Sequence, residues 1–181
     1  MASSISSQDA AAALRDIQRA EARSARLADY HHAAPHFIIW GVLWAIGYAL
    51  SHFLPGRKGA IWAVIVPIGL AAVVAAARTA GRGLGWRYGG AALAIGAFFA
   101  ATFLIMAPVS DRQVAAFIPL VVALAYVLWG IWGGPRYGVA GVLVALLTLA
   151  GFFLVTEHFF LWMAGVGGGA LILAGVWLRR V

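Results

Sequence analysis

The sequence contains no cysteine and few charged residues: of 181 residues, 13 are Lys or Arg and 6 are Asp or Glu. Without cysteine the chain cannot form disulfides, bind metals through thiolates or use a cysteine nucleophile. Charged residues make up 10% of the chain and hydrophobic residues 64%, whereas soluble domains average about 25% and about 45–50%. This composition excludes an ordinary soluble globular domain and an intrinsically disordered chain.

Ionisable and amide side chains are also missing from the centres of the apolar stretches. Such residues mark proton relays and ion pathways within membranes, so we do not expect an ion-coupled pump. The sequence has no Walker A, H-E-x-x-H or G-x-S-x-G motif and no paired intramembrane aspartates. These absences favour a protein without enzymatic activity, and the sequence assigns no cofactor.

Six apolar runs follow one another from residue 36 onward. They cover residues 36–54, 60–77, 89–107, 113–132, 137–155 and 159–178. Each is close to the roughly 20 residues that a helix needs to cross about 30 Å of hydrocarbon, and none alternates as a barrel strand would. We therefore predict an all-α membrane protein, a bundle of six transmembrane helices over residues 36–181.

A second level of organisation is suggested by a recurring tripeptide. Arg87-Tyr88-Gly89 and Arg136-Tyr137-Gly138 each open an odd-numbered run, and the preceding run carries one proline, Pro67 or Pro119. Either these are copies of one unit and the bundle consists of three helical hairpins, or they reflect the general preference of Arg and Tyr for membrane interfaces. Repeats of this kind are common in transporters.

The distribution of cations predicts the orientation. One side of the bundle would hold Arg15, Arg19, Arg23, Arg26, Arg78, Arg82, Arg87, Arg136, Arg179 and Arg180; the other would hold Arg57, Lys58 and Arg112. By the positive-inside rule both termini lie in the cytoplasm, and the Ala, Gly and Arg content is typical of a bacterial protein, which places the chain in the inner membrane. The formal charge of +7 is thus spread over joints and forms no compact patch for nucleic acid.

Residues 1–35 differ from the rest of the chain. Four arginines are balanced there by four acids, and Leu14, Ile17 and Leu27 lie roughly on one side of a predicted helix. Residues 1–35 are therefore expected to form a short cytoplasmic or interfacial helix, either as a plain lead-in to the membrane or as a docking helix that binds a cytosolic partner through residues 7–30. Pro35 disfavours one continuous helix across His31, His32 and His36.

The first run carries a stripe of aromatic and imidazole side chains at steps of four residues. Its members are His36, Trp40, Trp44, Tyr48 and His52. The stripe winds slowly round a helix and spans about 24 Å of membrane depth. It forms either one wall of a pocket for a quinone, a haem or a lipid tail, or an aromatic packing seam opposite a face of small residues (Gly41, Ala45 and Ala49) pressed against a neighbouring helix.

The joints on the less basic side hold a second group of chemically capable residues. These are His52, Asp111, Glu157 and His158. Two imidazoles and two carboxylates could bind Zn²⁺ or another divalent cation, or titrate as a pH sensor; the alternatives are a hydrated surface cluster, or a two-histidine haem site formed by His52 and His158. They come from different joints, so a site requires the fold to bring them together.

The last run contains two staggered patterns of small residues, Ala164…Gly168 and Gly165…Gly169. Either pattern allows close approach of two helices, within the chain or in a homo-oligomer. In its helix count and its glycine-rich last run, Gly165-Val166-Gly167-Gly168-Gly169, the chain resembles the small six-helix bacterial membrane proteins of the HdeD acid-resistance type, a likeness that implies no function here.

Three functions remain open at the level of sequence. The first is a non-enzymatic scaffold, stress-related or regulatory partner in the membrane. The second is a small transporter or channel for a neutral or apolar solute. The third is a haem-, quinone- or lipid-binding membrane protein.

Overall fold

The protein is helical throughout the part of the chain that the computed structural model describes, residues 7–79, 86–107 and 110–180. The elements are α1 (Ser7–Phe53), η1 (Pro55–Arg57), α2 (Lys58–Thr79), α3 (Trp86–Ile105), α4 (Asp111–Gly133), α5 (Pro135–Leu154), α6 (Phe159–Trp162), η2 (Met163–Gly167) and α7 (Gly168–Arg179). The last three are continuous and form one long helix with a π-helical turn at η2. The all-α class predicted from sequence is confirmed.

Within the described residues, five helical segments are long and apolar enough to cross a membrane. They are Ala11–Phe53, Pro55–Thr79, Asp111–Gly133, Pro135–Leu154 and Phe159–Arg179. Their outward faces are apolar; Leu154 and Leu173, for example, are 81% and 70% exposed. Since exposed apolar surface on this scale is favourable only in lipid, the chain has the character of a multi-pass membrane protein. The predicted third span coincides with α3, which contributes only the shorter apolar segment Leu93–Ile105, so the count of six is not confirmed.

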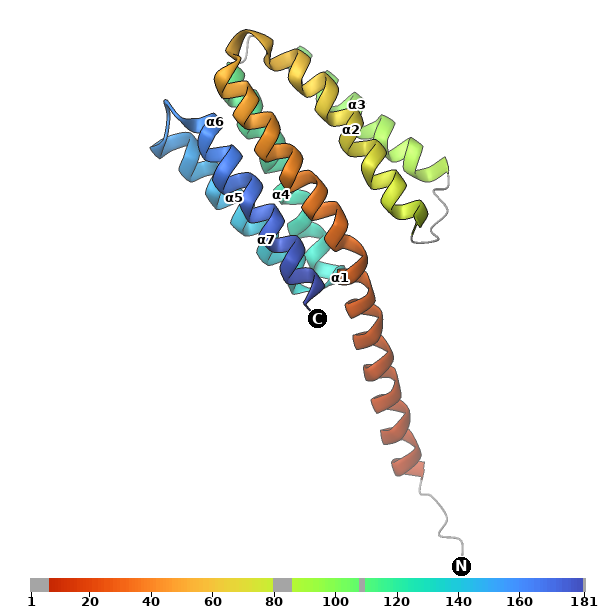
Figure 1. Ribbon diagram of the computed structural model, residues 1–181. Coiled ribbons are helices and arrows are strands. Elements are labelled where there is room, and N and C mark those ends of the chain that lie inside the picture. Colours follow the sequence, from red (N-terminus) through yellow and green to blue (C-terminus); the bar gives the residue numbers. More distant parts are fainter. Residues whose placement is uncertain (1–6, 80–85, 108–109, 181) are drawn as a thin grey trace, which may run out of the picture.

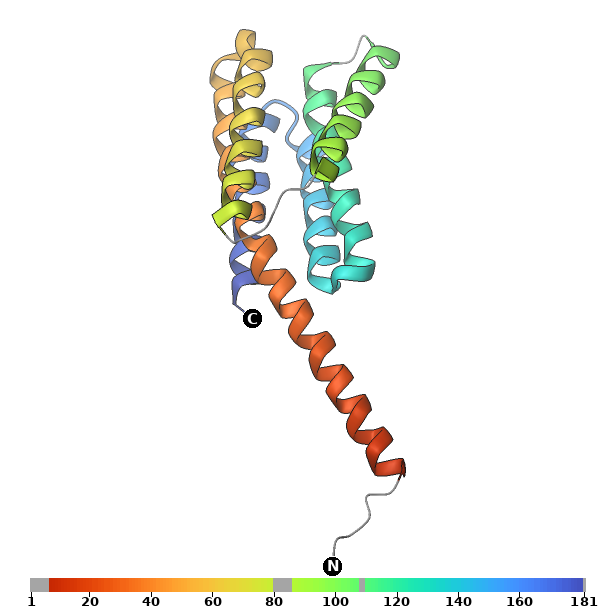
Figure 2. The same ribbon diagram turned by 90° about the vertical axis from the view of Figure 1, so that its right-hand side faces the viewer.

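The helices form two groups. In Figure 2, α1, α2 and the last helix lie on one side, and α3, α4 and α5 on the other. Within the groups, α1 packs against α2 and α7, and α4 packs against α5. The rings of Phe99 and Phe103 in α3 each lie 6.2 Å from that of Phe117 in α4. Consecutive helices α2 and α3 thus lie in different groups, and the arrangement as three hairpins is not confirmed.

The N-terminal segment is not a separate short helix. Contrary to the expectation at Pro35, α1 runs without interruption from Ser7 to Phe53 and includes this proline. A proline deprives the carbonyl four residues earlier, here that of His31, of its helical donor. His31 and His32 are exposed, so water at this level can take the place of the missing donor. The N-terminal half of α1 consequently projects from the bundle as an extension of the first span (Figure 1).

The contact between α1 and α7 depends on glycine. A Cβ added at Gly168 would lie 2.8 Å from the carbonyl oxygen of Gly41 and 2.9 Å from the backbone nitrogen of Ala45. Likewise, a Cβ at Gly175 would lie 2.9 Å from the carbonyl oxygen of Ala34. Only hydrogen at these positions lets the two backbones approach so closely, as in other membrane helix pairs. Gly41 and Ala45, the small residues of the first run, therefore face α7.

Of the two staggered small-residue patterns, one is used in this contact. Ala164 and Gly168 are buried, whereas a Cβ at Gly165 or Gly169 would meet nothing within 4 Å in the described part of the chain. The Ala164…Gly168 pattern thus serves packing within the chain.

Large aromatic side chains fill the space between the two groups of helices. Phe37 of α1 stacks on Tyr126 of α4 with ring centroids 4.4 Å apart, and Tyr30 lies 5.3 Å from Tyr137 of α5. Phe37 is 1% exposed.

The bundle has two ends, which are named here by the residues they hold. The His52 end contains η1 and the start of α6, and the C-terminal end contains the α4–α5 turn and Arg179.

Candidate functional site

The aromatic stripe of α1 packs against neighbouring helices. The indole of Trp40 lies against Gly69 of α2, where a Cβ would come within 2.9 Å of the ring. Reciprocally, the indole of Trp62 in α2 lies against Gly47 of α1, at 3.0 Å from a Cβ built there. Each tryptophan thus occupies the space that a glycine leaves on the opposite helix, which joins α1 to α2.

The remaining stripe residues continue this packing. His36 is half-buried and lies edge-on to Trp40, with ring centroids 6.4 Å apart. Trp44 and Tyr48 are buried and meet edge to face at 5.9 Å. None of the five side chains lines the cavity described below. The stripe therefore packs as a seam against neighbouring helices, and its role as the wall of a ligand pocket stays a prediction.

Tyr48 also makes a polar contact that the sequence did not reveal. Its hydroxyl donates a hydrogen bond of 2.6 Å to the carbonyl oxygen of Ala115 in α4. In a regular helix that carbonyl would accept from the backbone N–H of residue 119, but residue 119 is proline and has no N–H. A carbonyl without a donor is costly away from water. Tyr48 therefore supplies the hydrogen bond that Pro119 removes, and it links the two groups of helices.

The fold brings together only part of the His, Asp and Glu group at the His52 end. The rings of His52 and His158 stack with centroids 6.0 Å apart, which joins the end of α1 to the start of the last helix. Asp111 instead forms an ion pair of 2.9 Å with Lys58, and Glu157 is exposed. Among the described residues, no group of three or more His, Cys, Asp or Glu side chains is placed to hold a metal ion. The geometry thus offers a pair of imidazoles rather than a four-ligand site.

A junction at the C-terminal end joins α1, the α4–α5 turn and α7. The guanidinium of Arg136 donates to the carbonyl oxygen of Trp177 at 3.0 Å, and it lies 4.8 Å from the Trp177 ring and 5.4 Å from that of Tyr30. The hydroxyl of Tyr137 donates to the carbonyl oxygen of Asp29 at 3.1 Å. Arg136 and Tyr137 belong to the recurring tripeptide; the side chains of its other copy lie outside the described residues. The junction holds the base of the projecting part of α1.

At this junction the turn between α4 and α5 requires glycine. Gly134 has φ 122° and ψ 158°, a backbone conformation that is essentially restricted to glycine. A Cβ there would also collide with the hydroxyl of Tyr30. The close packing of Tyr30 on the turn is therefore possible only because residue 134 has no side chain.

We expect Arg136→Ala to lower the free energy of unfolding by about 1–2 kcal/mol, because it removes one hydrogen bond and two cation–π contacts. Arg180→Ala is the matched control, since Arg180 is an exposed arginine at the same end of the bundle. Both variants would be measured by equilibrium unfolding in mixed detergent micelles. Equal stability of the two would show that the junction contributes nothing beyond charge.

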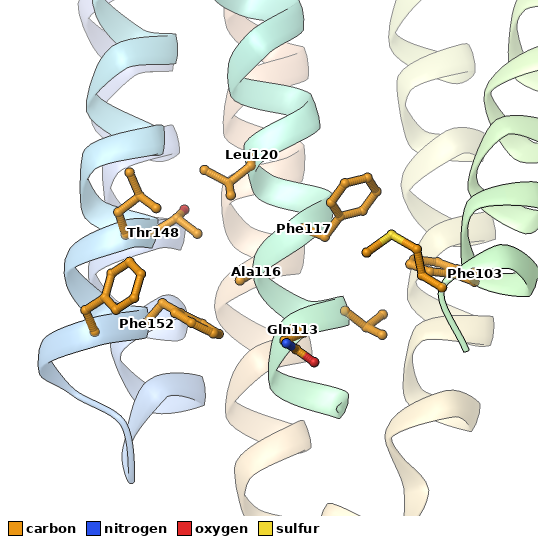
Figure 3. Close-up of a pocket in the computed structure, with 11 residues that line it drawn as sticks. Phe103, Gln113, Ala116, Phe117, Leu120, Thr148 and Phe152 are labelled. Carbon is orange, nitrogen blue, oxygen red and sulfur yellow. The ribbon is translucent and has the colours of Figure 1, made fainter. Parts of the chain in front are cut away.

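A cavity of about 390 Å³ lies between α3, α4 and α5, toward the His52 end of the bundle. Figure 3 shows part of its lining: Gln113, Ala116, Phe117 and Leu120 follow one another along α4, with Thr148 and Phe152 of α5 to one side and Phe103 of α3 to the other. This cavity was not predicted from the sequence. The α4 residues stand at helical spacing on one face, but that pattern alone does not distinguish a cavity wall from a packed or lipid-facing surface.

Comparison of the chain with protein-family models, with curated proteins and with solved structures gives no match. The resemblance to the HdeD-type proteins therefore rests on helix count and glycine content alone.

Proposed function

We propose that the protein is a scaffold or regulatory partner in a bacterial inner membrane, without enzymatic activity of its own, and that it presents residues 7–30 to a partner in the cytoplasm. The observation that carries this proposal is the projecting half of α1. Every side chain from Ala11 to Arg26 is exposed, and the segment stands clear of the bundle in both views (Figures 1 and 2).

The anchoring of this arm supports a docking role. Helical segments in proteins gain most of their stability from packing, yet residues 11–26, which we call the arm, have no tertiary cover among the described residues. It continues directly from a span that packs against α2 and α7, and α1 in total has 47 residues, a length of about 70 Å at 1.5 Å per residue. A rigid arm of this kind holds its surface at a set distance from the membrane.

The surface of the arm fits a protein partner better than a lipid surface. Leu14 and Ile17 are 57% and 55% exposed, and charged side chains of both signs surround them, including the Arg19–Asp16 pair at 3.4 Å. Since the arginines and acids of the segment balance, it lacks the excess positive charge that binds anionic lipid. An exposed apolar pair surrounded by charged side chains of both signs is suited to bind a partner helix that carries complementary charges. Homo-oligomerisation through the same surface is the alternative.

The orientation follows from the cations and is part of the same proposal. The ten arginines assigned above to one side would face the cytoplasm together with both termini, while Arg57, Lys58 and Arg112 would face the opposite side. A reporter fused to the C-terminus is expected to be active only in the cytoplasm. Activity of the reporter outside the cytoplasm would reverse the orientation and remove the cytosolic partner.

The docking role predicts a site-specific crosslink. A photo-crosslinking amino acid placed at Ile17 of the full chain in intact cells is expected to yield an adduct with one cytosolic protein. Ile17 is suitable because it forms the exposed apolar pair together with Leu14. Leu14→Asp should abolish that adduct, whereas Ala12→Asp, an equally exposed position, should leave it intact. Absence of any protein adduct, or an adduct insensitive to Leu14→Asp, would contradict the proposal.

The transporter alternative is tested separately. The purified protein in liposomes is expected to produce no flux of neutral solutes above that of empty vesicles, and no turnover. Reproducible flux would replace the scaffold by a small transporter or channel, for which the in-helix prolines Pro67 and Pro119 would be the first residues to test.

A further inference from the structure

The cavity between α3, α4 and α5 opens on the outward faces of these helices. Three of its lining residues are strongly exposed: Met106 by 55%, Leu149 by 41% and Phe153 by 69%. Leu149 and Phe153 belong to α5, and Met106 directly follows α3. The apolar outer surface of these helices requires lipid rather than water, so a bilayer around them would place acyl chains beside the cavity and make it a groove on the lipid-facing side.

The walls of the groove select for an apolar occupant. Phenylalanine, leucine, methionine, valine and alanine make up nearly all of the lining. Among the described residues of the lining, the one hydroxyl is that of Thr148, which donates to the carbonyl oxygen of Val144 in its own helix at 2.7 Å. Because the hydroxyl proton of Thr148 is engaged in this hydrogen bond, the middle of the groove offers no hydrogen-bond donor to a polar solute.

The His52 end of the groove is different, because it carries a positive charge. Gln113 lies at this end of the α4 row (Figure 3). Beside it, the guanidinium of Arg112 lies 4.7 Å from the ring of Phe152, a residue of the groove wall, and donates to the carbonyl oxygen of Thr156 at 3.4 Å.

The charge of Arg112 is not balanced by a carboxylate in the described part of the chain. The adjacent acid, Asp111, pairs with Lys58 instead, and the ion pairs found there do not include Arg112. A guanidinium has five N–H donors in a fork that matches phosphate oxygens. An apolar groove that ends at such a cation, at the edge of a membrane span, is complementary to a lipid with an anionic headgroup.

We infer that the groove binds one acyl chain of an anionic phospholipid from the surrounding leaflet, and that Arg112 contacts the phosphate of that lipid. A volume of about 390 Å³ lies within the range of roughly 300–1,000 Å³ that is usual for small-molecule sites. This site is distinct from the aromatic stripe of α1, and it does not depend on the docking role of residues 7–30.

The first experiment locates the acyl chain of the bound lipid. The full-length protein is placed in vesicles of phosphatidylglycerol and phosphatidylcholine that contain a trace of phosphatidylglycerol with a photoactivatable diazirine in its acyl chain, and labelled residues are mapped by mass spectrometry. Labelling should concentrate on the groove walls of α3, α4 and α5. Leu149→Trp, which fills the groove, should reduce it to the level of other outward faces, whereas Leu146→Trp should not, because Leu146 is 57% exposed on α5 but does not line the groove.

The second experiment tests the headgroup. The ratio of groove labelling by phosphatidylglycerol to that by phosphatidylcholine, each carrying the same diazirine chain, should fall about fivefold in Arg112→Gln, as expected for loss of one interfacial cation. Arg57→Gln is the matched control, because Arg57 is an exposed cation at the same end of the bundle and does not line the groove. Its ratio should remain that of the unchanged protein.

Each contrary result is decisive. Labelling spread evenly over all outward faces, or equal labelling of Leu149→Trp and Leu146→Trp, would show ordinary contact with bulk lipid and overturn the site. A crosslink from the groove to a second copy of the chain would replace the lipid by an oligomer interface. An unchanged ratio in Arg112→Gln would remove the role of the phosphate. If Leu149→Trp does not fold, Met106→Trp fills the groove from the residue that follows α3 and serves the same comparison.

Discussion

Replacement of Tyr48 by phenylalanine is expected to lower the free energy of unfolding by about 2 kcal/mol, although the aromatic ring is kept. The variant removes only the hydroxyl that donates to the Ala115 carbonyl oxygen. This carbonyl has no donor within its own helix because residue 119 is proline. Leaving a buried acceptor unsatisfied costs about 1–3 kcal/mol, and no water competes for it in an apolar layer. Equilibrium unfolding in mixed detergent micelles would measure the loss.

The mechanism makes a sharper prediction for the double variant. In Pro119→Ala the backbone N–H of residue 119 can donate to the same carbonyl, so Tyr48→Phe should cost less than about 1 kcal/mol in that background. Pro67→Ala is the matched control, because Pro67 also lies inside a helix but four residues beyond a different carbonyl. It should leave the cost of Tyr48→Phe unchanged. Equal costs in all three backgrounds would contradict the link between Tyr48 and Pro119.

The second large effect is expected at the contact between α1 and α7. Gly168→Val should destabilise the protein by about 3 kcal/mol or more, because the added side chain meets backbone atoms of α1 that cannot move aside as a side chain could. Gly169→Val makes the same change in intrinsic helix preference at the neighbouring position. A Cβ at that position meets nothing within 4 Å in the described residues. It should change stability by less than about 1 kcal/mol.

The two glycine variants would be compared by thermal unfolding and by proteolysis of the last helix. Destabilisation of Gly169→Val to the same extent as Gly168→Val would mean that the glycines matter through helix preference and not through the interface. A loss in Gly169→Val together with a change in oligomeric state would instead identify the Gly165…Gly169 pattern as a contact between copies.

The path of the first helix illustrates where local rules give the wrong answer. Pro35 indicated a break between residues 1–35 and the first span, because proline removes a backbone donor. The observed helix passes through it, since the freed carbonyl lies where neighbouring side chains are exposed. The cost of a helical proline depends on what can replace the missing donor: water near His31, and a tyrosine hydroxyl from another helix at Ala115. A local rule does not contain that information.

The candidate sites illustrate the same limit. The stripe of α1 and the residues of the His52 end were visible as patterns, because side-chain type and spacing are properties of the sequence. Whether His52 meets His158 or Asp111 depends on how three separate joints are placed in space. The fold brings the two imidazoles together, and it places Asp111 in an ion pair with Lys58. The groove at Arg112 was missed because its walls come from three helices.

The amino-acid sequence was enough to predict a helical chain that is apolar enough to need a membrane, because these properties follow from composition and from the length of each run. It also contained the small-residue positions that allow close helix contact. The three-dimensional arrangement of the helices shows which of these positions is used, which helices are neighbours, and that a proline in α4 is matched by a tyrosine in α1. These outcomes depend on contacts between residues far apart in the chain, whose energies cannot be assigned until the helices are placed beside one another.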